Sequence, residues 1–128
     1  MHEGNPTILI VEDDVDMARL NAKLLKRRGY DAMAAYTAAE ARSLVREVKP
    51  DLFVLDIGLP DGCGLSLCKE FQECSDAPVL FLTGRASTQD KVSGLKMGGD
   101  YYLTKPFDNT EFLAVVESLL RRTEKTRG

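Results

Sequence analysis

The sequence lacks several features that would place it in other classes of protein. It has no tryptophan, one histidine and three cysteines, an odd number that fits neither a disulfide framework nor a metal-binding spacing. No apolar run approaches the roughly 20 residues of a membrane span. The polar start, Met1–Pro6, has no signal-peptide core. These absences favour a cytoplasmic protein with reduced thiols and no membrane contact.

The composition that is present is typical of one globular domain. The chain has 128 residues, of which 44% are hydrophobic and 29% charged, so it can bury a core of its own. Its formal net charge is −3, from 17 basic and 20 acidic residues. A mildly acidic domain is not expected to bind nucleic acid directly.

Short apolar runs predict the strands of a sheet. Continuous runs of this kind are typical of strands buried on both faces, as in a parallel sheet. The three strong runs are Thr7–Val11, Leu52–Leu55 and Val79–Leu82. Two weaker runs, which could be edge strands, are Asp31–Ala35 and Tyr101–Leu103.

Helical spacing of apolar residues separates these runs. The stripes are Met17, Leu20 and Leu24; Ala38, Ala41, Val45 and Val48; and Phe112, Val116 and Leu119. Two further helices are expected near Leu65–Gln72 and Thr88–Met97. Thr37 with Glu40 and Asp108 with Glu111 resemble capping boxes, and Gly29 is placed to end the first helix.

This alternation predicts a doubly wound α/β fold. Five β-α units imply a five-stranded parallel sheet, flanked by five helices on its two faces. The order of strands in such a flavodoxin-like sheet is 2-1-3-4-5. Ligands then bind at the carboxyl ends of the strands, so the residues that follow each strand become the candidates for function.

Polar residues follow four of the five strands. They are Glu12, Asp13 and Asp14 after the first, Asp56 after the third, Thr83 after the fourth and Lys105 after the fifth. Clustered carboxylates repel one another unless a cation is shared between them. Carboxylate oxygens suit Mg²⁺, which phosphate oxygens usually complete, and Lys105 and Thr83 are residue types that hold phosphoryl groups. A carboxylate beside Mg²⁺ can also act as a nucleophile toward phosphorus.

This constellation resembles the receiver domain of two-component response regulators. Four segments carry the resemblance, which covers the chain from Thr7 to about Arg122: Ile8–Asp14, Leu55–Gly62, Phe81–Gly84 and Gly98–Phe107. It implies a receiver domain over residues 1–122, followed at 123–128 by a polar tail or the start of an interdomain linker.

The resemblance implies a role for each residue at the acidic end of the site. Asp56 would be the phosphoacceptor. Asp13 would bind Mg²⁺ directly and Glu12 through water, and the backbone carbonyl of Gly58 would be the remaining protein ligand. Asp14 lies one place past the family's acidic pair, where it is expected to begin the first helix instead.

The resemblance also assigns the phosphoryl-binding and switching residues. Thr83 would hydrogen-bond a phosphoryl oxygen and Lys105 would ion-pair with the phosphoryl group. Tyr102 would be the switch aromatic that turns inward as Thr83 moves. The family has a cis bond between its lysine and proline, here Lys105–Pro106. Three positions depart from the commonest pattern: Gly58, Gly84 and Arg85.

The function implied is that of a signalling switch and not an enzyme, although it assists its own phosphotransfer and dephosphorylation. Its partners would be a sensor histidine kinase and an output domain, which is expected to bind DNA and to lie outside this chain. The signal would pass through the fourth helix, fifth strand and fifth helix.

Members with OmpR/PhoB-type output dimerise through that face. Some residues here fit the charged pattern, namely Lys91, Asp100, Glu111 and Arg122, whereas Met97, Tyr101 and Val115 depart from it.

Three alternatives remain in other classes. A haloacid-dehalogenase-type phosphatase needs an aspartate two places after its nucleophile, where this chain has Gly58. A flavodoxin needs a hydroxyl- and glycine-rich loop after the first strand, where this chain is acidic. A pseudo-receiver would bind partners without being phosphorylated. The presence of Glu12, Asp13, Asp56 and Lys105 argues against this alternative.

Overall fold

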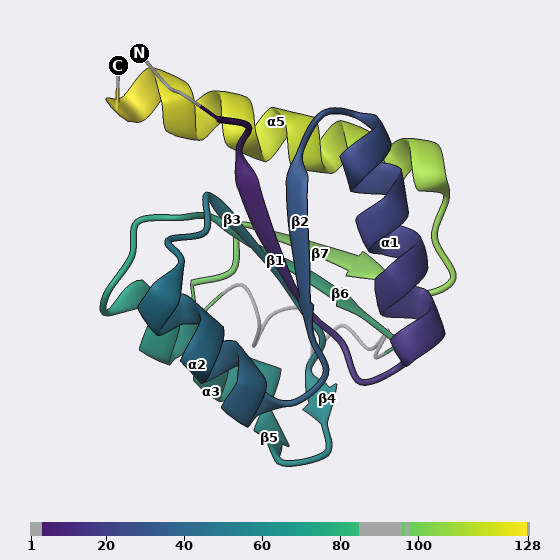
Figure 1. The fold of residues 1–128 in the computed structure, drawn as a ribbon, viewed down its shortest axis with the longest axis vertical. Helices are drawn as coiled ribbons and strands as arrows, with labels where there is room; N and C mark the ends of the chain where they lie inside the picture. Colours follow the sequence, from purple (N-terminus) through teal and green to yellow (C-terminus); the bar gives the residue numbers. More distant parts are fainter. Residues whose placement is uncertain (1–3, 85–95, 97, 128) are drawn as a thin grey trace.

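A five-stranded parallel sheet forms the centre of the computed structural model, which describes residues 4–84, 96 and 98–127 (Figure 1). Its strands are β1 (Thr7–Val11), β2 (Asp31–Ala35), β3 (Leu52–Leu55), β6 (Val79–Thr83) and β7 (Tyr101–Thr104). Their order is β2-β1-β3-β6-β7, with every neighbouring pair parallel. Counted along the chain, the main sheet has the predicted order 2-1-3-4-5.

The labels differ from that count because the strands of a small second sheet come between β3 and β6 along the chain. It is the antiparallel pair β4 (Gly58–Leu59) and β5 (Gly62–Cys63), which the sequence did not predict.

Helices cover both faces of the sheet (Figure 1). They are α1 (Val15–Arg27), α2 (Ala38–Glu47), α3 (Gly64–Gln72) and α5 (Asn109–Arg127). One buried cluster joins the sheet to α1 and α5, and a second joins it to α2 and α3. The fifth predicted helix, near Thr88–Met97, lies outside the described residues apart from Lys96. Since α5 runs past Arg122, the predicted domain end there stays a prediction.

The strands are apolar throughout because both of their faces are buried. Ile8 and Ile10 point into the cluster under α1 and α5, whereas Leu9 and Val11 point into the cluster under α2 and α3. This alternation follows from the two-residue period of a strand. Continuous apolar runs are therefore what a sheet covered on both faces requires.

Local signals set the ends of α1. The Asp14 carboxylate accepts a hydrogen bond from the Met17 backbone N–H at 3.1 Å, so Asp14 caps the helix as predicted. Gly29 follows the helix with a φ of +90°, which glycine adopts without the steric cost of a side chain. The helix therefore begins directly after the acidic pair Glu12 and Asp13.

Two different segments cap α2. Thr37 Oγ1 accepts from the Glu40 N–H at 3.1 Å, and the Glu40 carboxylate accepts from the Tyr36 N–H at 2.8 Å, one residue before the usual capping-box donor. In addition, Asp61 accepts from the Ala38 and Ala39 N–H groups at 2.7 and 3.1 Å. Asp61 thus ties the loop after β3 to the start of α2.

Candidate functional site

The predicted site residues meet at the carboxyl ends of the central strands. Backbone hydrogen bonds extend the sheet by one step on each side of the site. The Asp56 N–H donates to the Val11 carbonyl at 3.0 Å, and the Lys105 N–H donates to the Thr83 carbonyl at 2.8 Å. Asp56 therefore lies beside the end of β1, and Lys105 beside the end of β6. The Lys105–Pro106 peptide bond is cis, as expected.

Three carboxylates form the acidic part of the site. Oxygen atoms of Glu12, Asp13 and Asp56 all lie within 4.8 Å of one another. Glu12 is 3% exposed and Asp56 is 8% exposed, whereas Asp13 is open to solvent. An all-oxygen set of this size, open on one side, suits a Mg²⁺ ion that keeps several of its waters. The donor set therefore fits the predicted metal.

Lys105 provides the positive charge that the cluster needs. Its ammonium donates to Glu12 Oε1 and, at 3.2 Å, to Asp56 Oδ2. Burial lowers the pKa of Lys105, but the hydrogen bond to Glu12 and the charge of Asp56 outweigh it and raise the net pKa. The ammonium thus stays charged between the two carboxylates at neutral pH.

Glu12 is the carboxyl of the cluster whose pKa is raised. Burial raises the pKa of Glu12 from 4.5 to about 7, although Lys105 and the Asp14 N–H act to lower it. The neighbouring charge of Asp56 raises it further. A second cation beside Glu12 would relieve this cost.

Both oxygens of Asp56 have partners. Oδ2 faces Lys105, and Oδ1 accepts from the Gly58 N–H at 3.2 Å. The chain therefore holds the carboxylate in one orientation. A Cβ built on Gly58 would meet nothing within 4 Å, so the space at position 58 is open.

The two predicted switch residues are both buried. Thr83 is 1% exposed at the end of β6, and Tyr102 is 8% exposed on β7. The Tyr102 ring packs against Phe81, with ring centres 5.9 Å apart. Tyr102 thus already lies inward in this structure, and its movement with Thr83 stays a prediction. Gly84 is exposed and has open space around it, and Arg85 lies outside the described residues.

The sequence analysis missed one residue that positions the site. Gly64, the first residue of α3, lies so close to the backbone of Asp56 that an added Cβ would be 2.1 Å from the Asp56 carbonyl oxygen. The Gly64 N–H also donates to the Ile57 carbonyl at 2.9 Å. The only signal in the sequence was a glycine directly before the helix expected near Leu65–Gln72, and it does not reveal such a close approach.

Comparison with known proteins gives a consistent result. The sequence matches the response regulator receiver domain family over residues 8–117. A crystal structure of a two-component response regulator from Clostridium difficile is similar, with a TM-score of 0.89 and 33% identity, covering 92% of this chain and 98% of that one.

Two longer proteins are similar in sequence. The chain is 41% identical over 123 residues to the DNA-binding dual master transcriptional regulator RpaA of Synechocystis sp., covering 94% of this chain and 51% of that protein. It is 44% identical over 115 residues to the uncharacterized transcriptional regulatory protein YrkP of Bacillus subtilis, covering 90% and 49%. The chain thus spans about half the length of these relatives. Among the described residues, no helix has the length and apolar character needed to span a bilayer.

Proposed function

The chain belongs to the family of response regulator receiver domains, and we propose on this basis that it is a phosphorylation-dependent switch with Asp56 as its phosphoacceptor. The observation that carries the proposal is the meeting of Glu12, Asp13, Asp56 and Lys105 at one edge of the sheet. A buried carboxylate with an adjacent ammonium and an open side can both attack and hold a phosphoryl group.

The proposed transfer uses the partners that Asp56 already has. An Asp56 carboxylate oxygen attacks the phosphorus of a phosphohistidine on a sensor kinase. The phosphorus–nitrogen bond breaks and the imidazole keeps its electron pair. Lys105 exchanges its contact with the Asp56 carboxylate for one with a phosphoryl oxygen, and the Thr83 hydroxyl donates to another.

The residues that would hold Mg²⁺ are Glu12, Asp13, Asp56 and the Gly58 carbonyl. When bound, the ion neutralises charge that develops on the transferred oxygens. Hydrolysis of the resulting acyl phosphate, assisted by the same residues, would return the switch to its starting state.

The proposed readout starts from the backbone hydrogen bond that the Lys105 N–H donates to the Thr83 carbonyl. That bond joins β6 to β7, so a movement of Thr83 reaches Tyr102 and the outer surface of β7 and α5. A cavity of about 340 Å³ lies on this surface, where Tyr101 is 41% exposed. Phosphorylation would shift the population of two forms of this surface.

The output of the switch belongs to the proposal as well. Because the relatives named above are transcriptional regulators about twice as long, we expect a DNA-binding domain to receive the signal. A homodimer formed by this surface after phosphorylation is the route we propose. Asp100 and Arg122, expected at such an interface, pair within one chain at 3.2 Å. They would have to exchange partners for the dimer to form.

Intact-protein mass spectrometry tests the function directly. The protein is incubated with acetyl phosphate and Mg²⁺, beside a sample with EDTA and beside Asp56→Asn. We expect one phosphoryl adduct in the wild type with Mg²⁺, much less with EDTA and none in the variant. No adduct in the wild type would favour a pseudo-receiver, and an adduct that persists in Asp56→Asn would place the chemistry elsewhere.

A further inference from the structure

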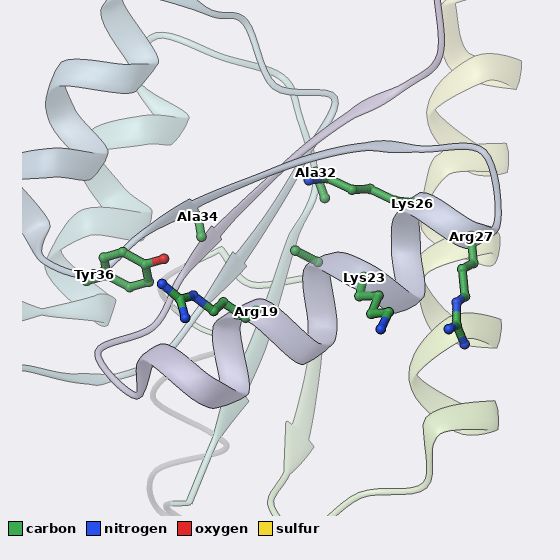
Figure 2. Close-up of a pocket in the computed structure, with 8 residues that line it drawn as sticks. Arg19, Lys23, Lys26, Arg27, Ala32, Ala34 and Tyr36 are labelled. Atoms are coloured by element: carbon green, nitrogen blue, oxygen red, sulfur yellow. The ribbon is translucent and has the colours of Figure 1, made fainter.

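A second concave surface lies on the outer edge of the sheet, between α1 and β2 (Figure 2). It has a volume of about 510 Å³, within the range of ligand sites. Its lining residues are Arg19, Ala22, Lys23, Lys26, Arg27, Ala32, Ala34 and Tyr36. None of them is a residue of the phosphoacceptor site described above.

The rim of this groove is strongly basic. Arg19, Lys23, Lys26 and Arg27 carry four positive charges, and no carboxylate lines the groove. None of the four forms an ion pair with any residue in the part of the chain that the structure describes. Cations in the last turn of α1 suit the helix dipole, which accounts for Lys26 and Arg27 but not for the other two.

Two of the four cationic side chains lie along the groove, whereas those of Lys23 and Arg27 extend from α1 away from β2 (Figure 2). Figure 2 shows Arg19 reaching from α1 toward Tyr36 at one end, and Lys26 reaching toward Ala32 at the other. The floor between them consists of the small side chains Ala22, Ala32 and Ala34. A larger residue at either position of β2 would fill this space.

The groove borders an unpaired strand edge. Within the described sheet, β2 is the outermost strand and pairs only with β1. The Asp31 N–H donates to the Pro6 carbonyl, and the Ala35 carbonyl accepts from the Glu12 N–H. Because alternate residues of a strand face the same neighbour, the backbone groups of Ala32 and Ala34 must point away from β1. They form the open edge directly above the groove.

The next outward N–H along this row, that of Tyr36, is already bound by a carboxylate. Glu40 accepts from it at 2.8 Å, as described for the cap of α2. The open edge is therefore short and runs over Ala32–Ala34. An added strand would need few residues to cover it, and its acidic side chains would not meet Glu40 if it stopped before Tyr36.

We propose that this groove binds an extended acidic segment of a partner protein, which adds as a strand to the open edge of β2. Its backbone pairs with Ala32 and Ala34, and acidic side chains at alternate positions meet Arg19 and Lys26 of α1. Charge complementarity selects this occupant, since four cations that lack ion-pair partners among the described residues repel a basic segment or a second copy of this edge. The site is independent of phosphorylation at Asp56.

Nuclear magnetic resonance of the ¹⁵N-labelled protein tests the proposal with synthetic peptides. The probe is an acetylated, amidated hexapeptide of alternating Glu and Thr. Its controls are a block arrangement of the same residues, a version with Lys for Glu, and two versions N-methylated at one or the other set of alternate amides. We expect the alternating probe to shift the Ala32 and Ala34 amides and to slow their hydrogen exchange.

Protein variants separate charge from backbone pairing. Arg19→Gln combined with Lys26→Gln should weaken binding about two- to thirtyfold, because each of the two exposed pairs contributes about 0.2–1 kcal/mol. The matched control, Lys69→Gln on α3, should leave the affinity unchanged. One of the two N-methylated peptides should lose binding, because its methyl groups block the amides that face β2.

Three outcomes would overturn the proposal. They are no shift at Ala32 and Ala34, equal binding of the block peptide, and full binding of both N-methylated peptides. The last two would reveal a basic surface that attracts anions without strand addition. The Asp56→Asn protein should bind the probe as the wild type does, so failure here is distinguishable from failure of the proposed switch.

Discussion

The substitution Gly64→Ala tests whether α3 positions the phosphoacceptor. The added Cβ would lie 2.1 Å from the Asp56 carbonyl oxygen and 2.9 Å from the Ile57 Cα, both of them backbone atoms. Contacts of a Cβ shorter than 3.0 Å essentially do not occur. The start of α3 or the backbone of Asp56 must therefore move by about 1 Å.

Two effects of that movement can be estimated. Forcing a methyl group into a packed site costs about 1–3 kcal/mol, which we expect as a lower free energy of unfolding. Alanine is intrinsically better than glycine in a helix by about 1 kcal/mol, so the sign of the change is itself informative. A misplacement of about 1 Å at a reacting carboxylate can slow the chemistry on the order of 100-fold.

Urea unfolding and the initial rate of phosphorylation by acetyl phosphate measure the two effects. Two other glycines of the same loop provide matched controls. A Cβ on Gly58 would meet nothing within 4 Å, and one on Gly62 would lie 3.3 Å from the Ala38 Cβ. We expect Gly58→Ala to unfold near the wild-type midpoint, and Gly62→Ala to be affected less than Gly64→Ala because its neighbour needs to move by only a few tenths of an ångström. A Gly64→Ala protein with wild-type stability and wild-type rate would refute the reasoning.

Three further predictions concern single side chains. With EDTA present, the wild-type free energy of unfolding should fall as pH rises from about 4.5 to 7. The reason is that the raised pKa of Glu12 lets the folded state hold a proton that the unfolded state has lost. The Glu12→Gln variant should show a flatter dependence on pH when its free energy of unfolding is measured in urea titrations. Asn21→Leu should raise the free energy of unfolding by about 1–2 kcal/mol in urea, because both polar atoms of this buried amide lack a partner within the described structure. Hydrogen bonds from Ala38 and Ala39 lower the pKa of Asp61, so its stabilisation is present at neutral pH and lost as pH falls through that lowered value. Asp61→Asn should accordingly lower the thermal midpoint at pH 7 and have less effect at pH 3.

Much of the fold follows from periodicity. The continuous apolar runs favoured strands covered on both faces, and the polar residues after them had to meet at one edge once the strands were parallel. That is why Glu12, Asp56 and Lys105 could be grouped from the sequence. The cap at Asp14 and the turn at Gly29 were also predictable, because both depend on residues within one helical turn.

Other features depend on distant contacts that no local pattern records. Asp61 caps α2 from the loop after β3, a partnership across 23 positions of the chain. The β4–β5 pair contains no apolar alternation that would have revealed it. The sequence also could not decide which carboxylates Lys105 would contact, because that choice depends on the register of β1, β3 and β7 at the site. The packing of Tyr102 on Phe81 likewise depends on the pairing of β6 with β7.

The most direct test of the central claim is to locate the phosphoryl group. The protein is phosphorylated with acetyl phosphate and Mg²⁺, the acyl phosphate is reduced with borohydride to an alcohol, and the digested peptides are sequenced by mass spectrometry. We predict that the reduced residue is at position 56. Reduction at Asp13 or another carboxylate, or a phosphoryl group that resists borohydride because it is held on a hydroxyl, would contradict the account.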